Sequence, residues 1–260
     1  DIVLVLAGSS AGRDDYTSTI IEELGEVLFH GIAIKPGKPA VLGSVGNVPV
    51  VGLPGYPVSA IIIMEEIVKP LVDLYYQRPF EEEAIVTAVL GKRVVSSLKY
   101  QEYVRVTLGK VGDTLTAIPL NRGAGIITSF TKADGILVVP QDSEGFEMGE
   151  KVQIRLLKDI SQIENSLIVT GSHDPLIDEL SDLIRKKGHS FYITSSHVGS
   201  MGAITAIKNG QAHLGCIHLL DTETGKYNES YIEKYFPDGK VKLVKGVGRI
   251  QGLKVKKGNP

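Results

Sequence analysis

Residues 2–15 read IVLVLAGSSAGRDD and decide the fold expected for the first part of the chain. The run from Ile2 to Ala7 is continuously apolar, which is typical of a parallel strand buried on both faces. A loop of small residues follows, and apolar residues then recur with helical spacing from Asp15 to Leu24. A buried strand, a small-residue loop and a helix in this order predict an α/β layer with a parallel sheet.

Outward from this stretch, the hydrophobic pattern changes twice. The α/β pattern first continues, with expected strands at 32–34 and 48–53 and a long expected helix at 58–75. From residue 83 the apolar period becomes two, which predicts a small antiparallel barrel or sandwich with strands at 84–90, 103–108, 114–119, 135–139 and 151–156. An α/β pattern then starts again, with expected strands at 167–170 and 190–194 and expected helices at 175–187 and 201–209.

These changes divide the 260 residues into three expected domains. We place an α/β domain at 1–76, a β domain at 77–160 and a second α/β domain at 161–260. The chain opens with Asp1 inside a strand-like run and ends at Pro260 without a finishing element. We therefore expect a piece of a longer protein, in which the first and last domains are incomplete.

The composition is that of an ordinary soluble globular protein. Hydrophobic residues make up 43%, charged residues 22%, and the net charge is −2, which excludes disordered, coiled-coil and collagen-like classes. No apolar run reaches the roughly 18 to 20 residues that cross a bilayer, and no signal peptide is visible, so we expect a cytoplasmic protein without a membrane partner. Trp is absent and the basic residues are not interleaved with aromatic ones, so we expect no nucleic-acid partner. The single cysteine, Cys216, is expected to be a buried small residue.

The loop after the first strand is the first candidate site. Its small residues, among them Gly8, Ser10 and Gly12, let backbone N–H groups approach an anion at the carboxyl end of a parallel strand, where ligands bind. Asp14 and Asp15 have two interpretations. One of them caps the following helix, or one of them binds Mg²⁺ or substrate, since Mg²⁺ is typically held by one or two carboxylates and by phosphate oxygens.

Two later turns also suit an anionic ligand. Residues 35–39 read KPGKP, and the two prolines stiffen a loop that presents two lysines, as a phosphate or other oxyanion site would need. The alternative is that both lysines are only solvated. Residues 53–60 read LPGYPVSA and predict a strand-to-helix turn with Pro57 in the first helical turn. This turn either lines a pocket or serves only as a turn.

Together the three motifs resemble those of the molybdopterin molybdotransferase family, which includes MoeA and the E domain of gephyrin. The family runs GGxSxGxxD, PGKP and LPGNPVSA correspond to residues 7–15, 36–39 and 53–60. The resemblance covers residues 1–160 and continues through 103–106 and 133–140. It implies the C-terminal half of that family: part of a three-layer α/β molybdopterin-binding domain, followed by a small antiparallel β-barrel.

The resemblance also implies an activity and a set of roles. Members insert molybdenum from molybdate into adenylylated molybdopterin and release AMP with Mg²⁺ present, and they form homodimers. The resemblance assigns catalytic roles to Asp15, Lys35 and Lys38, with Asp15 also the metal ligand. Contacts with the pterin substrate fall on Gly8, Ser10, Gly12, Asp14, Gly37, Pro54, Gly55, Pro57, Ser59 and a substrate-facing Arg105.

The sequence departs from the family pattern at three places. Ala7 stands where a second glycine is usual, Tyr56 replaces the asparagine of the LPGNP run, and a serine often found near Ala124 is missing. The family's N-terminal domains, which help to complete the site, are not in these 260 residues. We therefore do not expect this piece alone to turn over.

The third segment contains its own candidate anion-binding motifs. Residues 170–175 and 195–202 each follow an expected strand and precede a helix, and two hydroxyl-rich helix starts that face each other would bind a tetrahedral oxyanion. With HLLD at 218–221 and RIQGL at 249–253, the segment resembles part of the periplasmic-binding-protein-like α/β domain fused to some molybdotransferases. The expected oxyanion-binding residues are Ser172, His173, Asp174, Gly199 and Ser200. The alternative is that Ser172, Asp174 and Ser200 only cap helices.

Our leading hypothesis is a molybdopterin molybdenumtransferase with small-molecule substrates and a fused oxyanion-binding module. The main alternative is a non-enzymatic molybdate or molybdopterin sensor that keeps the transferase fold. Another nucleotide-processing enzyme on the same sheet is a third interpretation, against which the two turns and the barrel argue.

Overall fold

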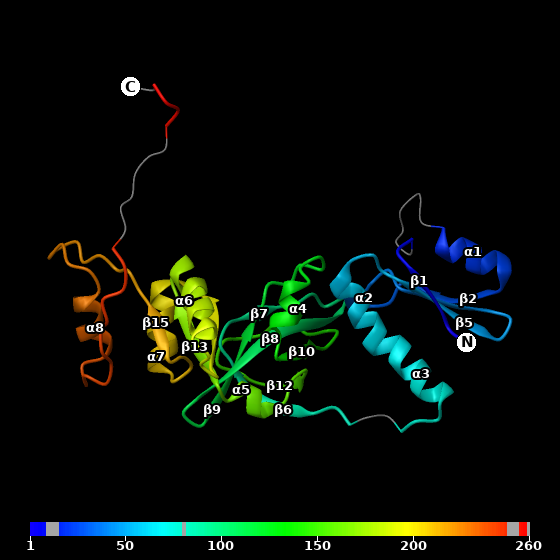
Figure 1. Ribbon diagram of the computed structural model, residues 1–260, viewed down its shortest axis with the longest axis horizontal. Helices are drawn as coiled ribbons and strands as arrows, with labels where there is room; N and C mark the ends of the chain where they lie inside the picture. Colours follow the sequence, from blue (N-terminus) through cyan, green and yellow to red (C-terminus); the bar gives the residue numbers. More distant parts are fainter. Residues whose placement is uncertain (9–15, 80–81, 249–254, 259–260) are drawn as a thin grey trace.

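The computed structural model describes residues 1–8, 16–79, 82–248 and 255–258. Figure 1 shows three parts that follow one another along the long axis in sequence order. The first part contains a sheet with helices, the second a barrel, and the third a smaller sheet with helices.

The sheet of the first part is mixed, not parallel as expected. β1 (Val3–Leu6) pairs in parallel with β5 (Val48–Leu53), and the antiparallel strands β4 (Val41–Val45) and β2 (Glu26–His30) complete the order β1-β5-β4-β2. The reason is a tight hairpin, because only two residues separate β4 from β5. The first of them, Gly46, has the positive φ of +59° that such turns favour.

The first strand is exposed, which corrects the expectation that it is buried on both faces. Val3, Leu4 and Leu6 are 45%, 42% and 69% exposed. β1 stands at an edge of the sheet, and in the described part of the chain β5 alone pairs with it. A continuous apolar run therefore marks an edge strand here.

Helices cover both faces of this sheet, as the expected three-layer arrangement requires (Figure 1). α1 (Thr17–Leu24) buries Ile21 against Val50, whereas the next residue, Val51, packs with Ile63 on the other face. The expected long helix is confirmed as α2 (Pro57–Ile63), the π-helical η1 (Met64–Val68) and α3 (Lys69–Tyr75) in direct succession. The π-helical turn precedes Pro70, which has no N–H to continue the α-helical ladder.

The second part is a closed five-stranded barrel. Its strands are β6 (Ile85–Leu90), β8 (Gln101–Val111), β9 (Thr114–Pro119), β10 (Gly135–Val139) and β12 (Lys151–Leu156). They follow the order β10-β12-β6-β9-β8, and a β10–β8 pairing closes the ring. The expected barrel is confirmed, except that β6 and β9 pair in parallel. Core residues such as Leu90, Leu108 and Ile154 fill the interior.

Shorter elements surround the barrel. β7 (Val94–Val95) pairs with β11 (Gly145–Phe146), and α4 (Thr128–Lys132) follows the loop after β9. β3 (Ile34–Lys35) lies in the expected first domain, yet it extends the barrel sheet by pairing in parallel with β8.

The third part is a three-stranded parallel sheet in the order β14-β13-β15. Its elements are α5 (Ile160–Ile163), β13 (Ser166–Gly171), α6 (Pro175–Lys186), β14 (Tyr192–His197), α7 (Gly199–Lys208), β15 (Leu214–Cys216) and α8 (Glu229–Tyr235). The expected α/β pattern is confirmed, and β15 and α8 add to it. Ile168 of β13 packs with Ile118 of the barrel.

Among the described residues, none of the helices has the length and apolar character that crossing a membrane requires.

Candidate functional site

The loops after β1 and β5 meet at the carboxyl edge of the first sheet. The two strands run in parallel register and end opposite each other at Leu6 and Leu53. A Cβ atom placed on Gly55 would lie 3.3 Å from Cβ of Ala7, and one on Gly8 would lie 2.9 Å from Oγ1 of Thr17. Gly8 also has φ of +73°. Small residues are therefore needed for two backbone segments to approach this closely.

Two departures from the family pattern lie at this edge. Ala7 has φ of +67°, a conformation that glycine adopts freely and that costs an alanine about 1 kcal/mol. Tyr56 is 66% exposed, and its ring lies within van der Waals reach of the position where Gly125 would carry a side chain. Pro57 begins α2 as expected, whereas Pro54 and Ser59 are buried.

A barrel loop lies over the start of α2. The backbone N–H of Val58 donates to the carbonyl of Ala124 at 3.1 Å, and this contact brings residues 121–125 beside the strand-end loops. The loop therefore connects the edge of the first sheet with polar side chains of the barrel.

The lysine turn has the compact form that its sequence suggests. The Lys35–Pro36 peptide bond is cis, and Gly37 has φ of +123°. A Cβ atom on Gly37 would meet Cδ1 atoms of Ile34 and Ile63 at 3.0 Å each, so the turn packs against the long helix. Lys38 lies over the ring of Tyr100, 5.7 Å from its centroid.

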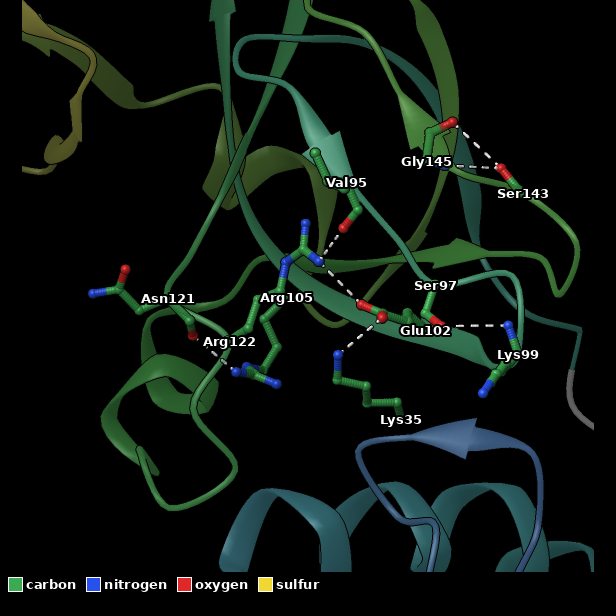
Figure 2. A network of polar contacts seen from close by, with 10 residues as sticks. All are labelled: Lys35, Val95, Ser97, Lys99, Glu102, Arg105, Asn121, Arg122, Ser143 and Gly145. Carbon is green, nitrogen blue, oxygen red and sulfur yellow. Dashed lines mark hydrogen bonds and ion pairs between the residues drawn. The ribbon is translucent and has the colours of Figure 1, made fainter.

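A buried carboxylate that the sequence interpretation missed connects this turn with the barrel. Glu102 of β8 is 3% exposed in its side chain, and its Oε1 lies 3.1 Å from Nζ of Lys35. Its Oε2 accepts from Nη1 of Arg122 at 3.0 Å, and the same Nη1 also donates to the carbonyl of Val95 (Figure 2). The sequence held one signal that could have revealed it, because the charged Glu102 directly precedes the strand expected at 103–108.

The structure buries Arg105, which corrects the expectation of a substrate-facing side chain. The residue is 2% exposed, and its Nη2 donates to the carbonyl of Asn121 at 2.8 Å. Loop 121–125 therefore covers it. Burial lowers the pKa of the Arg105 guanidinium, and the positive charge of Arg122 lowers this pKa further. Its Nε is buried and makes no hydrogen bond to any residue that the structure describes.

The charges of this network do not cancel. Two cations, on Lys35 and Arg122, bind the single carboxylate of Glu102. Lys35 and Arg122 keep 57% and 35% of their side chains exposed. An excess of positive charge on partly exposed groups favours the binding of an anion.

Four predicted site residues, Ser10, Gly12, Asp14 and Asp15, lie outside the described residues. Elsewhere in residues 1–8, 16–79, 82–248 and 255–258, no three His, Cys, Asp or Glu side chains form a group that could hold a metal ion. The metal and catalytic roles of Asp15 therefore stay predictions.

The third part has a second edge of parallel strand ends. Gly171, His197 and Cys216 end their strands in register, so the loops that follow lie together. The rings of His173 and His197 are in edge-to-face contact, with centroids 4.3 Å apart. This contact brings together the residues that precede α6 and α7, as the predicted oxyanion site requires.

Most polar groups at this second edge satisfy one another. Asp174 caps α6 by accepting from the N–H of Leu176 at 2.9 Å. Oγ of Ser200 instead accepts from the N–H of His218 at 3.1 Å, and the N–H of Ser172 donates to the carbonyl of Cys216. Gly199 begins α7 with φ of +74°.

Cys216 is half-buried, not fully buried as expected, because β15 is an edge strand. Burial raises the pKa of its thiol, and the carboxylate of Asp174 raises this pKa further.

Three family models match successive parts of the chain. Residues 1–73 match a probable molybdopterin binding domain, residues 87–157 match the MoeA C-terminal region, domain IV, and residues 181–260 match a PBP superfamily domain.

Relatives match over about three fifths of the chain. A Methanocaldococcus jannaschii protein named for molybdopterin biosynthesis is 37% identical over 158 residues, which are 61% of this chain and 37% of that protein. The molybdopterin molybdenumtransferase of Haemophilus influenzae is 32% identical over 59% of this chain and 39% of its own length. The MoeA crystal structure from Pyrococcus horikosii aligns with a TM-score of 0.48 at 36% identity, over 61% of this chain and 37% of that one.

The chain spans a little over a third of the length of these relatives. The models that match its first two parts are those of the molybdopterin-binding domain and of MoeA domain IV, in the order that the sequence motifs predict. The chain is therefore a MoeA-family protein that carries a PBP superfamily domain after domain IV.

Proposed function

We propose that this chain works in molybdenum cofactor biosynthesis as part of a molybdopterin molybdenumtransferase. The reaction inserts molybdenum from molybdate into adenylylated molybdopterin and releases AMP. The names of the relatives support this proposal, and so does one observation. Two close-packed strand-end loops lie beside a network with an excess of positive charge on Lys35 and Arg122.

The geometry suits the charges of both substrates. Adenylylated molybdopterin carries a pyrophosphate and molybdate is a dianion, so Lys35 and Lys38 can hold oxyanions at the rigid turn. The small residues Gly8 and Gly55 let a ligand approach the backbone closely. Preformed cations near the scissile phosphate stabilise the charge that develops on the leaving AMP. The dithiolene of the pterin carries the metal chemistry, and the protein chiefly positions it.

The proposal includes three further features. Mg²⁺ would offset charge on the phosphates and be held by Asp15, the protein would act as a homodimer, and it would work in the cytoplasm. Residues outside this chain would complete the site. The test therefore uses the longer protein of which this chain is expected to be a part, here called the parent protein.

The test supplies adenylylated molybdopterin, Mg²⁺ and molybdate to the parent protein and follows AMP release. Molybdate-dependent AMP release is expected, and Lys35→Ala should slow it about 100-fold if that lysine holds a reacting oxyanion. Lys110→Ala is the matched control, because Lys110 forms an exposed pair with Glu164 elsewhere on the barrel. Molybdate binding without AMP release would instead support the sensor.

For the third part we propose that it binds a tetrahedral oxyanion through Ser172, His173 and Ser200. The contact between the rings of His173 and His197, at adjacent strand ends, supports this proposal. Titration calorimetry of the parent protein with molybdate tests it, since His173→Gln should remove one binding event and leave that of the first part. Two unchanged binding events in this variant would contradict it.

A further inference from the structure

One carboxylate is shared by two cations that come from different parts of the chain. Lys35 belongs to β3 and Arg122 to the loop after β9, and each binds a different oxygen of Glu102 (Figure 2). The carboxylate is 3% exposed, whereas its two partners are 57% and 35% exposed. A buried anion therefore anchors two cations that remain open to solvent.

This anchoring restricts both cations. Lys35 and Glu102 are direct partners in the β3–β8 register, and Nη1 of Arg122 is held by Val95 as well as by Glu102. Free lysine and arginine side chains lose rotamer entropy when a ligand orders them. A scaffold that orders them beforehand removes part of this cost from ligand binding.

The same network has unused capacity for an anion. Within the described residues, Arg122 donates both of its hydrogen bonds through Nη1, which leaves the other edge of its guanidinium for a ligand. The N–H groups on that edge can donate to oxygens of a phosphate or of another tetrahedral dianion.

We propose that Glu102 is a positioning residue for the anionic substrate, and that Arg122 is an additional anion-binding residue beside Lys35. The inference rests on the proposed function, because it takes the phosphates and molybdate of that reaction as ligands. Glu102 does not contact the anion, since like charges repel. It fixes the separation of the two cations that do.

A purely structural role predicts something different. Glu102 also ties β3 to the barrel, and a residue that did only this would affect stability alone. Glu102→Gln separates the two roles, because it keeps the size of the side chain and removes its charge. Loss of a competing carboxylate favours anion binding, and loss of the ordering of the two cations opposes it, so anion binding should change by less than about threefold. The looser cations should slow AMP release about tenfold.

The experiment measures pyrophosphate binding by calorimetry, AMP release and thermal unfolding for the parent protein and its variants. Arg122→Gln should weaken pyrophosphate binding about tenfold, and Arg122→Lys should restore part of it. Arg93→Gln and Glu147→Gln are matched controls, because Arg93 and Glu147 form a pair on the same barrel that is more than 60% exposed on both sides. Neither control should change binding or turnover.

The outcomes separate the two proposals. The inference is supported by weaker binding in Arg122→Gln, together with slower AMP release and a change in binding of less than about threefold in Glu102→Gln. A lower melting temperature of Glu102→Gln with unchanged kcat and KM would overturn it, as would a parent protein that does not bind pyrophosphate. A parent protein that shows the binding pattern but releases no AMP would overturn the proposed function and leave the anion site standing.

Discussion

The edge where β1 and β5 end and the edge where β13 and β14 end obtain their polar groups in different ways. At the ends of β1 and β5, the charged groups come from distant parts of the chain, namely Lys35, Glu102 and Arg122. At the ends of β13 and β14, the polar groups are local, and Asp174 and Ser200 bind backbone N–H groups of the same sheet unit. The first edge therefore depends on how parts of the chain pack together, and the second on its own loops.

The largest expected loss of stability comes from a substitution that disrupts the second edge and leaves the first edge intact. A Cβ atom on Gly171 would lie 2.2 Å from the carbonyl oxygen of Cys216, and the residue has φ of +129°. Gly171→Ala should destabilise the third part by about 4 kcal/mol, which hydrogen exchange measured part by part would show. Gly210→Ala is the control, since Gly210 has φ of +65° and no atom within 4 Å of its Cβ position. That variant should cost about 1 kcal/mol. Equal losses in the two variants would contradict the prediction.

The second-largest effect on stability is expected from a substitution at the first edge. Glu102→Ala removes the shared carboxylate and leaves Lys35 and Arg122 to repel each other, which should lower the free energy of unfolding by about 2 kcal/mol. Urea unfolding measures this loss. Glu147→Ala should change stability by less than about 0.5 kcal/mol, because the pair it breaks is exposed. A loss in Glu102→Ala no larger than in this control would show that the shared carboxylate adds no stability.

A smaller effect tests whether the second edge is self-contained. Asp174→Ala removes the cap of α6 and should cost about 1 kcal/mol, whereas Asp174→Asn keeps an acceptor oxygen and should cost little. Hydrogen exchange of the first turn of α6 measures the difference. If the two edges are independent, AMP release should be unchanged in both variants. A loss of AMP release in Asp174→Ala that accompanies its loss of stability would show that the second edge influences the first.

The smallest effect is a pH dependence at the second edge. Burial lowers the pKa of His197 below its ordinary value of 6.5, and the neighbouring His173 lowers it further. The unfolded chain therefore binds a proton more readily, so the third part should lose stability as the pH falls from about 6.5 through the lowered pKa. Urea unfolding between pH 5 and 7.5 should show this slope, and His197→Gln should flatten it. His30→Gln, in the first part, should leave the slope in place.

The sequence predicted those features that depend on local pattern. The long helix, the barrel and the second α/β unit follow from periodicity, and the Asp174 cap follows from a residue type before a helix. The hairpin that makes the first sheet mixed carried a signal too, since Gly46 and Asn47 separate two apolar runs.

The features that the sequence did not predict depend on contacts between distant residues. The exposure of β1 follows from its place at a sheet edge, which an apolar run alone does not indicate. Lys35 and Glu102 are 67 residues apart, and their pairing follows from the β3–β8 register. Arg105 is buried because a loop 16 residues later supplies the carbonyl that covers it. None of these has a signature within one short stretch of chain.

The pairing of β3 with β8 has a practical meaning for anyone who dissects this protein. A cut near residue 77 looks natural in the sequence, but it divides one hydrogen-bonded sheet between two fragments. The barrel fragment would be left with an unpaired strand edge at Gln101 and Glu102 and with a buried carboxylate that has lost Lys35. Such a fragment invites self-association through that edge. A recombinant piece that begins before Ile34 keeps the sheet whole.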